Sequence, residues 1–243
     1  MKETAQESVE KTGKVTVGDL VAKDFRAAGI FEKYGIDFCC GGNVAVDDIC
    51  NEMGIDPVQV RREIEQAAAT PMDRSQNYNA WELPFLADYI VNTHHTYLKE
   101  NTRTIAAYAN KIAQVHGANH PEVVKIAEIF EKVAADMELH LREEEEQLFP
   151  AIKRMVELAK AGTTPKETDV QSLRMTLSGL NHEHDEIGAA VHAIRDLSNN
   201  YAVPGDVCNT FMVTYMKLKE FEDDLHKHVH LENNILFPKA AKL

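Results

Sequence analysis

Cysteine is scarce in this chain, and long apolar runs are missing. Four cysteines in 243 residues are too few for the disulfide framework that holds small secreted domains together. The amino-terminal segment MKETAQESVEK has none of the apolar stretch of a secretory signal, and no later segment approaches the roughly 20 apolar residues that cross a bilayer. We therefore expect a cytoplasmic protein that does not span a membrane and whose cysteines are thiols.

Positive charge is also in short supply. The chain has 26 lysines and arginines against 39 aspartates and glutamates, which gives a formal net charge of −13. Binding to nucleic acid or to an anionic membrane surface relies on clustered Lys and Arg. We expect neither nucleic acid nor a membrane surface to be a partner.

Strand patterns are nearly missing as well, and helical periodicity takes their place. Long amphipathic segments, separated by short polar connections, cover four ranges: 81–114, 121–160, 166–198 and 205–236. The third begins at Thr164-Pro165-Lys166-Glu167, which fits a capping box with proline at the first helical position. Short connections between helices of similar length favour an antiparallel four-helix bundle. The sequence therefore predicts an all-α fold.

The amino-terminal part is predicted to form a small helical unit. One helix is expected from Val17 to about Lys33, ended by Gly35, and a second over 46–53. A third should start at Asp56-Pro57, with aspartate as the N-cap and proline at N1. Because the polar stretch 70–80 has no periodicity, it is predicted to be a linker. We divide the chain into domains 1–75 and 76–243.

Two of the four cysteines are adjacent, in the stretch YGIDFCCGGN at 34–43. A zinc site normally spaces its cysteines as C-x-x-C, because two intervening residues let both sulfurs converge on one ion. Cys39 and Cys40 therefore need another explanation, either as functional thiols or as two buried thiols that pack as small apolar residues.

A motif that occurs twice in the chain indicates a metal site in the bundle. HLREEEEQLFP at 140–150 and HVHLENNILFP at 228–238 each place a glutamate four residues after a histidine. On a helix such residues share one face, and here that face also carries the apolar stripe. His140, Glu144, His228 and Glu232 therefore point into the core, where unpaired carboxylates cost several kcal/mol each and a bound cation is the usual resolution.

The same helical phase selects one histidine from each remaining long helix. His94 continues the stripe of the first helix, whereas its neighbour His95 lies on the polar side, and His184 continues the stripe of the third. The predicted ligands are four histidines and two glutamates: His94, His140, Glu144, His184, His228 and Glu232. Six ligands suit two ions bridged by the glutamates, and imidazole and carboxylate suit iron, manganese or zinc.

Other polar residues have more ordinary readings. Asp136, one turn before His140, is a candidate to orient a ligand by a hydrogen bond. His116 and His120 lie at a helix–helix turn, where capping and function are both open. Three further histidines are expected to face solvent: His182, His226 and His230.

Taken together, these stretches resemble the Repair of Iron Centers family, the iron–sulfur cluster repair di-iron proteins. FEKYGIDFCCGGN is similar to the family's ScdA-type amino-terminal domain. IVNTHHTYL, HLREEEEQLFP, NHEHDEIG and HVHLENNILFP are similar to the ligand motifs of its hemerythrin-like bundle. The resemblance covers nearly the whole chain, and its first-helix motif offers both His94 and His95.

The resemblance implies the same six ligands and two iron ions, joined by an oxo or hydroxo bridge. It implies repair of iron–sulfur clusters damaged by oxidative or nitrosative stress, by iron donation more than by enzymatic turnover, with damaged iron–sulfur proteins as partners. Cys39 and Cys40 would then handle iron or redox chemistry, and the chain would form a homodimer. The alternatives are a hemerythrin-like sensor of O2 or NO, an NO-reducing di-iron protein, and an iron store or interaction module.

Overall fold

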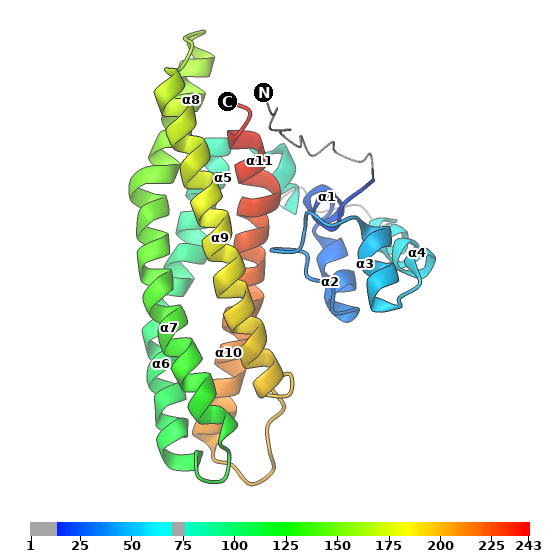
Figure 1. The fold of residues 1–243 in the computed structure, drawn as a ribbon, viewed down its shortest axis with the longest axis vertical. Coiled ribbons are helices and arrows are strands. Elements are labelled where there is room, and N and C mark those ends of the chain that lie inside the picture. The colour runs from blue at the N-terminus through cyan, green and yellow to red at the C-terminus, as the bar shows by residue number, and fades with distance from the viewer. Residues whose placement is uncertain (1–13, 70–75) are drawn as a thin grey trace, which may run out of the picture.

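The computed structural model describes residues 14–69 and 76–243. Within these two ranges every regular element is helical, apart from one isolated bridge between Thr16 and Ala45. Figure 1 shows a long helical bundle, formed by α5 to α11, with a small lobe formed by α1 to α4 at its side. The all-α prediction is confirmed.

The first helix of the small lobe is capped by its own side chains. α1 (Val17–Lys23) begins after Thr16, whose hydroxyl accepts a hydrogen bond from the Asp19 amide while the Asp19 carboxylate accepts one from the Thr16 amide. α2 (Arg26–Lys33) follows as a separate helix, so the single helix predicted over 17–33 is wrong. Asp24 breaks it, because its carboxylate bonds the amide and guanidinium of Arg26 in place of helical bonding.

The rest of the lobe follows the prediction closely. Gly35 ends α2 with a φ of 70°, a left-handed conformation that glycine adopts without a steric penalty. α3 covers Val46–Met53, and α4 covers Pro57–Ala68 with the Asp56 carboxylate accepting a hydrogen bond from the Val58 amide.

The bundle contains four long helical stretches, and short π-helical segments interrupt three of them. The stretches are formed by α5 (Leu83–Ile90), η3 (Val91–His95) and α6 (Thr96–His116); by α7 (Glu122–Glu143), η4 (Glu144–Leu148) and α8 (Phe149–Lys160); by α9 (Glu167–Leu197); and by α10 (Asn209–Leu231), η5 (Glu232–Leu236) and α11 (Phe237–Ala240). α6 contacts α7, α7 contacts α9, and α10 contacts both α9 and α6, which closes the bundle. The observed ends differ from the predicted ones by at most four residues.

Two details at the ends of the bundle differ from expectation. α9 begins at Glu167 with Lys166 as its N-cap and no side-chain cap hydrogen bond, so the capping box predicted at Thr164 is wrong. Part of the predicted linker, 70–75, lies outside the described residues. Its remainder includes η2 (Tyr78–Ala80), in which the buried Tyr78 ring packs against Trp81 and Phe25.

The apolar interior of the bundle is divided in two by a layer of polar side chains. One apolar cluster includes Leu98, Met137 and Val229, and the other includes Ile90 and Leu231. A set of buried polar side chains lies near the point on each stretch where one cluster gives way to the other: His94, His95, His140, Glu144, His184, His228 and Glu232. No helix within the described ranges has both the length and the apolar character needed to cross a membrane.

Candidate metal centre

Six polar side chains from the four bundle stretches meet in this layer, all nearly or fully buried. They form two overlapping groups whose candidate ligand atoms lie within 4.8 Å of one another: His95, Glu144, His228 and Glu232 in the first, and His140, Glu144, His184 and Glu232 in the second. Both glutamates belong to both groups. The arrangement therefore has two centres, each with its own pair of imidazoles and a share in two carboxylates.

In the first group the imidazole nitrogens face each other and the carboxylates. Nε2 of His95 lies 3.2 Å from Nε2 of His228. It is 3.4 Å from Oε2 of Glu144, and Nε2 of His228 is 3.1 Å from Oε2 of Glu232. Lone pairs of four side chains thus point at one small volume.

The second group repeats this geometry on the other two stretches. Nε2 of His140 lies 3.0 Å from Nε2 of His184. Glu144 Oε2 is 3.4 Å from the first of these nitrogens, and Glu232 Oε2 is 3.3 Å from the second.

Three of the four imidazoles are held from behind by a hydrogen bond at Nδ1. His95 bonds Glu145 at 2.7 Å and His140 bonds Glu183 at 2.8 Å. His184 bonds the side-chain oxygen of Asn233 at 2.7 Å. Metal-binding histidines are oriented in this way, because an acceptor at Nδ1 leaves Nε2 free to bind the ion. Glu183 therefore occupies the role that the sequence suggested for Asp136.

π-Helical turns accompany the ligands on three of the four stretches. η3 ends at His95, η4 begins at Glu144 and η5 begins at Glu232. A π-turn adds one residue to a helical turn, and such turns occur frequently at functional sites. Here each one shifts the phase of the helix at the point where a ligand is presented.

This shift changes the assignment on the first stretch, where the structure brings His95 into the cluster in place of His94. Phase counting assumed an uninterrupted α-helix, and the extra residue of η3 carries His95 inward as well, so that both side chains are buried. His94 lies beside the cluster, where its Nδ1 is 2.9 Å from Asp224 Oδ1 and its ring stacks on His228. The other five predicted ligands all lie in the two groups.

Burial sets the protonation of these groups. It raises the pKa of Glu144 well above its ordinary value, and the adjacent Glu232 carboxylate raises it further. Burial acts in the same direction on Glu232, but the neighbouring His228 and His184 imidazoles outweigh it and hold the pKa of Glu232 well below its ordinary value. Burial also lowers the pKa of His95 to about 3 and that of His228 to about 4. Both imidazoles are neutral at pH 7, the form that binds a metal.

The donor set fits a pair of metal ions. All four oxygens of Glu144 and Glu232 are buried without a hydrogen-bond donor, although a buried carboxylate without a partner is costly. A cation between the imidazoles satisfies these oxygens and removes the repulsion between the two carboxylates. The cluster is therefore a metal site of nitrogen and oxygen ligands.

The adjacent cysteines lie against the outside of the bundle near this site. The Asp37 carboxylate accepts hydrogen bonds from the amides of Cys39 and Cys40 and, at 3.1 Å, from the Cys39 thiol. The Cys40 thiol donates to the carbonyl oxygen of His184 at 3.4 Å, which joins the loop to a residue of the metal site. The Cys39 thiol forms a hydrogen bond with Cys40 and is buried, and both effects raise the pKa of Cys39 well above the ordinary value.

Close backbone approach makes this docking possible. Gly188 on α9 leaves room for the Cys40 sulfur, since a Cβ there would lie 2.8 Å from it. Asn234 donates from its side chain to the Phe38 carbonyl oxygen at 3.0 Å, and a Cβ at Gly42 would lie 2.6 Å from the Asn234 oxygen. In Figure 1 the loop between α2 and α3 extends from the lobe toward the bundle.

The docked lobe corrects two predictions about surface histidines. His226 and His230 were expected to face solvent, but both are buried, because the Phe38 ring covers them at centroid distances of 5.9 Å. His182 is exposed, as expected. His116 lies with its Nε2 3.1 Å from the Cys208 sulfur, and His120 lies 3.2 Å from Glu122.

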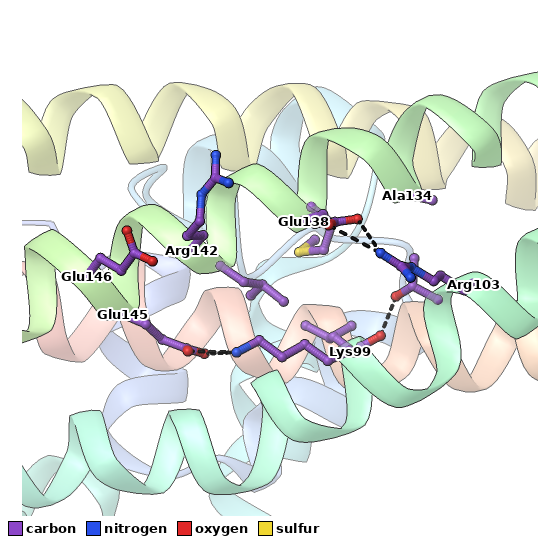
Figure 2. A pocket seen from close by; sticks show the side chains of 11 residues that line it. Lys99, Arg103, Ala134, Glu138, Arg142, Glu145 and Glu146 are labelled. Atoms are coloured by element: carbon purple, nitrogen blue, oxygen red, sulfur yellow. Dashed lines mark hydrogen bonds and ion pairs between the residues drawn. The ribbon is translucent and has the colours of Figure 1, made fainter.

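A cavity of about 410 Å³ opens between α6 and α7 beside the metal site. Figure 2 shows its polar wall, where Lys99 pairs with Glu145 at 2.6 Å and Arg103 pairs with Glu138. Glu145 is also the acceptor for His95. The cavity therefore reaches the residue directly behind one of the metal-facing imidazoles.

A buried set of four imidazoles and two shared carboxylates in a four-helix bundle defines a hemerythrin-like cation-binding protein. Comparisons with known proteins agree. Residues 86–240 match the family described as Hemerythrin HHE cation binding domain, and residues 13–68 match ScdA_N, described as Domain of Unknown function (DUF542).

The chain is 30% identical to the iron-sulfur cluster repair protein ScdA of Staphylococcus haemolyticus, over 95% of this chain and 99% of that protein. It is 31% identical to a probable iron-sulfur cluster repair protein of Haemophilus influenzae, over 88% and 91% of the two chains. It is 29% identical to the iron-sulfur cluster repair protein YtfE of Musicola paradisiaca, over 93% and 96%. The chain belongs to the family of iron–sulfur cluster repair proteins with a hemerythrin HHE domain, so the family resemblance is confirmed.

Proposed function

We propose that this protein repairs iron–sulfur clusters damaged by oxidative or nitrosative stress and that it supplies iron from a dinuclear store in its bundle. The observation that carries the proposal is the metal centre itself, with two imidazole pairs sharing two buried carboxylates that have no hydrogen-bond donors. The names of its relatives support the repair function. Damaged iron–sulfur proteins are the proposed partners.

Two iron ions, bridged by Glu144 and Glu232 and by an oxo or hydroxo group, are the proposed occupants. His95 and His228 would hold one ion, and His140 and His184 the other. Imidazole and carboxylate ligands suit non-haem iron, and histidines and carboxylates projecting inward from the helices form the di-iron sites of other bundles. The bound iron would supply the ion for a damaged cluster, while the protein holds it with ligands harder than a cluster's thiolates.

The cysteine pair is proposed to pass iron, or to carry out redox chemistry, on the outer side of the bundle. Support comes from its position, because the Cys40 thiol is hydrogen-bonded to the backbone of His184, a residue of the metal site. Thiolates are soft ligands that suit exchange with an iron–sulfur cluster. Cys39 would have to lose its proton to act, and a bound metal ion lowers the pKa of a coordinating thiol.

Metal content is the first test. We expect about two irons per chain in anaerobically purified wild-type protein and almost none in the Glu144→Ala, Glu232→Ala double variant, measured by mass spectrometry. His95→Ala should lose iron, whereas His94→Ala should keep it. Retention of about two irons per chain by the double variant would overturn the dinuclear site.

Reactivation of a damaged iron–sulfur dehydratase then tests repair. The iron-loaded wild type should restore its activity anaerobically, and the iron-free double variant should not. Cys39→Ser and Cys40→Ser, with iron content unchanged, should slow the transfer if the thiols pass iron. Equal rates with and without the thiols would remove the cysteines from the mechanism.

Reversible binding of NO or O2 is the second candidate function. It is favoured by the small donor set, because two imidazole nitrogens and two carboxylate oxygens leave room on each ion for further ligands. Absorbance changes of the iron protein under NO or O2 that persist in Cys39→Ser and Cys40→Ser, together with no repair of the dehydratase, would favour this function.

Two further proposals concern the setting of the protein. A cytoplasmic location is supported by its four free thiols, two of them buried, which a reducing compartment preserves. A homodimer is proposed from the family resemblance. Sedimentation of the full chain tests it, and a monomer over the whole concentration range would contradict it.

A further inference from the structure

A second cluster of metal-binding side chains lies on α9 and α10, apart from the dinuclear centre. The ligand atoms of His192, Glu222 and His226 lie within 4.8 Å of one another. The two imidazole nitrogens are 3.3 Å apart, and Oε1 of Glu222 is 3.7 Å from Nε2 of His226. Glu222 and His226 are one helical turn apart on α10, so their side chains share one face.

This geometry repeats the features that mark the dinuclear centre. Two imidazoles from neighbouring helices face each other through Nε2, and a buried carboxylate from the same helix as one of them joins the pair. Glu222 is 3% exposed, and its Oε1 accepts no hydrogen bond, although it forms an ion pair with Arg195. A cation between the three side chains would satisfy that oxygen and both ring nitrogens.

One positive side chain competes for the same carboxylate. Nη1 of Arg195 lies 3.2 Å from Oε1 of Glu222, and the guanidinium is partly exposed. Without a metal, Arg195 balances the buried charge of Glu222. A divalent ion would have to displace it, which makes binding at this cluster weaker and more reversible than at the dinuclear centre.

The cluster also lies beside the cysteine loop. His184, Gly188 and His192 follow one another at four-residue spacing on α9, with the Cys40 sulfur over Gly188. The Phe38 ring packs on His226, and the charge of Asp37 acts on both histidines of the cluster. Along this face of α9 the order is therefore dinuclear centre, thiol and second cluster.

We propose that His192, Glu222 and His226 form a second, mononuclear site for a divalent transition-metal ion, at the junction of the cysteine lobe and the bundle. Two histidines and one carboxylate are the donor set of mononuclear Fe²⁺ sites and of several zinc sites, with further positions left to water or another ligand. An iron ion at this site would be bound on the face of the bundle next to Cys40, outside the dinuclear centre.

The test measures metal alone, with Fe²⁺ and separately with Zn²⁺, by anaerobic equilibrium dialysis of untagged full-length protein. The background is Glu144→Ala, Glu232→Ala, which removes both shared carboxylates of the dinuclear centre. We expect this variant to bind one ion per chain. Adding His192→Ala should weaken that binding by at least about 10-fold, since disturbing even the outer partners of a ligand costs that much.

Three further variants sharpen the result. Glu222→Gln keeps the size of the side chain but not its charge, and it should also lose the ion. His182→Ala on the exposed side of α9 is the matched control and should change nothing. Arg195→Gln removes the competing cation and should tighten binding.

Equal binding by the His192→Ala and His182→Ala variants would overturn the site, because it would mean adventitious surface binding only. No bound ion in the background variant would overturn it as well. If that variant does not fold, the wild type should bind one ion more than His192→Ala does, and equal metal content would refute the proposal. The measured quantity is the difference in bound metal between proteins with and without His192. The proposal can therefore be refuted whether or not the dinuclear centre exists.

Discussion

Replacing Glu144 by glutamine should make the metal-free protein more stable, although it destroys the proposed function. The side chains of Glu144 and Glu232 are fully buried, and none of their four oxygens has a hydrogen-bond donor. Each such group costs about 1–3 kcal/mol, and more when it is charged. A glutamine amide can donate to Glu232 and carries no charge, so we expect Glu144→Gln to raise the free energy of unfolding of the metal-free protein by about 1–3 kcal/mol at pH 7.

The pH dependence follows from the raised pKa of Glu144. The folded protein holds this proton more tightly than the unfolded chain, so the wild type loses stability as the pH rises above the ordinary glutamate value. The advantage of Glu144→Gln should therefore be larger at pH 7 than at pH 5. With iron present the order should reverse, because an ion at 100 times its Kd adds about 2.7 kcal/mol to the protein that binds it.

Urea unfolding followed by circular dichroism, on metal-free and iron-loaded protein at both pH values, measures these differences. Glu146→Gln is the matched control, since Glu146 belongs to the same π-turn but is exposed. A metal-free Glu144→Gln variant that is less stable than the wild type at pH 7 would refute the reasoning, because it would mean that the carboxylate is satisfied without a cation.

Three other predictions concern the docked lobe and the exposed thiol of Cys208. Gly188→Ala should speed alkylation of the Cys40 thiol, since the new Cβ would lie 2.8 Å from the Cys40 sulfur. Gly179→Ala on the same helix is the control, because its Cβ meets no atom and should only stabilise the protein by about 1 kcal/mol. Equal alkylation rates of Cys40 in the two variants would contradict the docking. Asn234→Ala removes the hydrogen bond to the Phe38 carbonyl oxygen and should weaken docking of the lobe by about 1 kcal/mol. The weaker docking should appear as faster hydrogen exchange in α1, and unchanged exchange would contradict this prediction. The alkylation rate of Cys208 should reach half its maximum near pH 7, because the hydrogen bond with His116 lowers the pKa of this thiol to about 7. If His116→Ala leaves that midpoint unchanged, the hydrogen bond is not the cause.

The fold was predictable because helical phase is a property of the chain alone. The four long stretches were predicted to within four residues at each end, and the bounds of α3 were predicted to the residue. Helical phase also predicted that His140 and Glu144 face the core together, because two residues one turn apart share a helix face and a carboxylate on an apolar face is conspicuous.

What escaped prediction depends on contacts between distant parts of the chain. Burial of His226 and His230 comes from a lobe that begins more than 180 residues earlier, and no pattern within α10 announces it. Glu183 and Asn233 orient their histidines from neighbouring helices, where nothing in the local sequence separates them from other surface residues. The sequence offered both His94 and His95, and helical phase selected His94 because a π-turn leaves no clear mark on apolar periodicity.

The π-turn before His95 has a consequence for comparing these chains with one another. One extra residue within η3 means that two related sequences can agree in every flanking apolar position and still differ by one residue at the ligand. An ungapped alignment across 91–95 then transfers the ligand to the wrong member of the histidine pair. Superposition of the ring nitrogens is the safer basis, because they, and not the numbering, define which side chain reaches the metal.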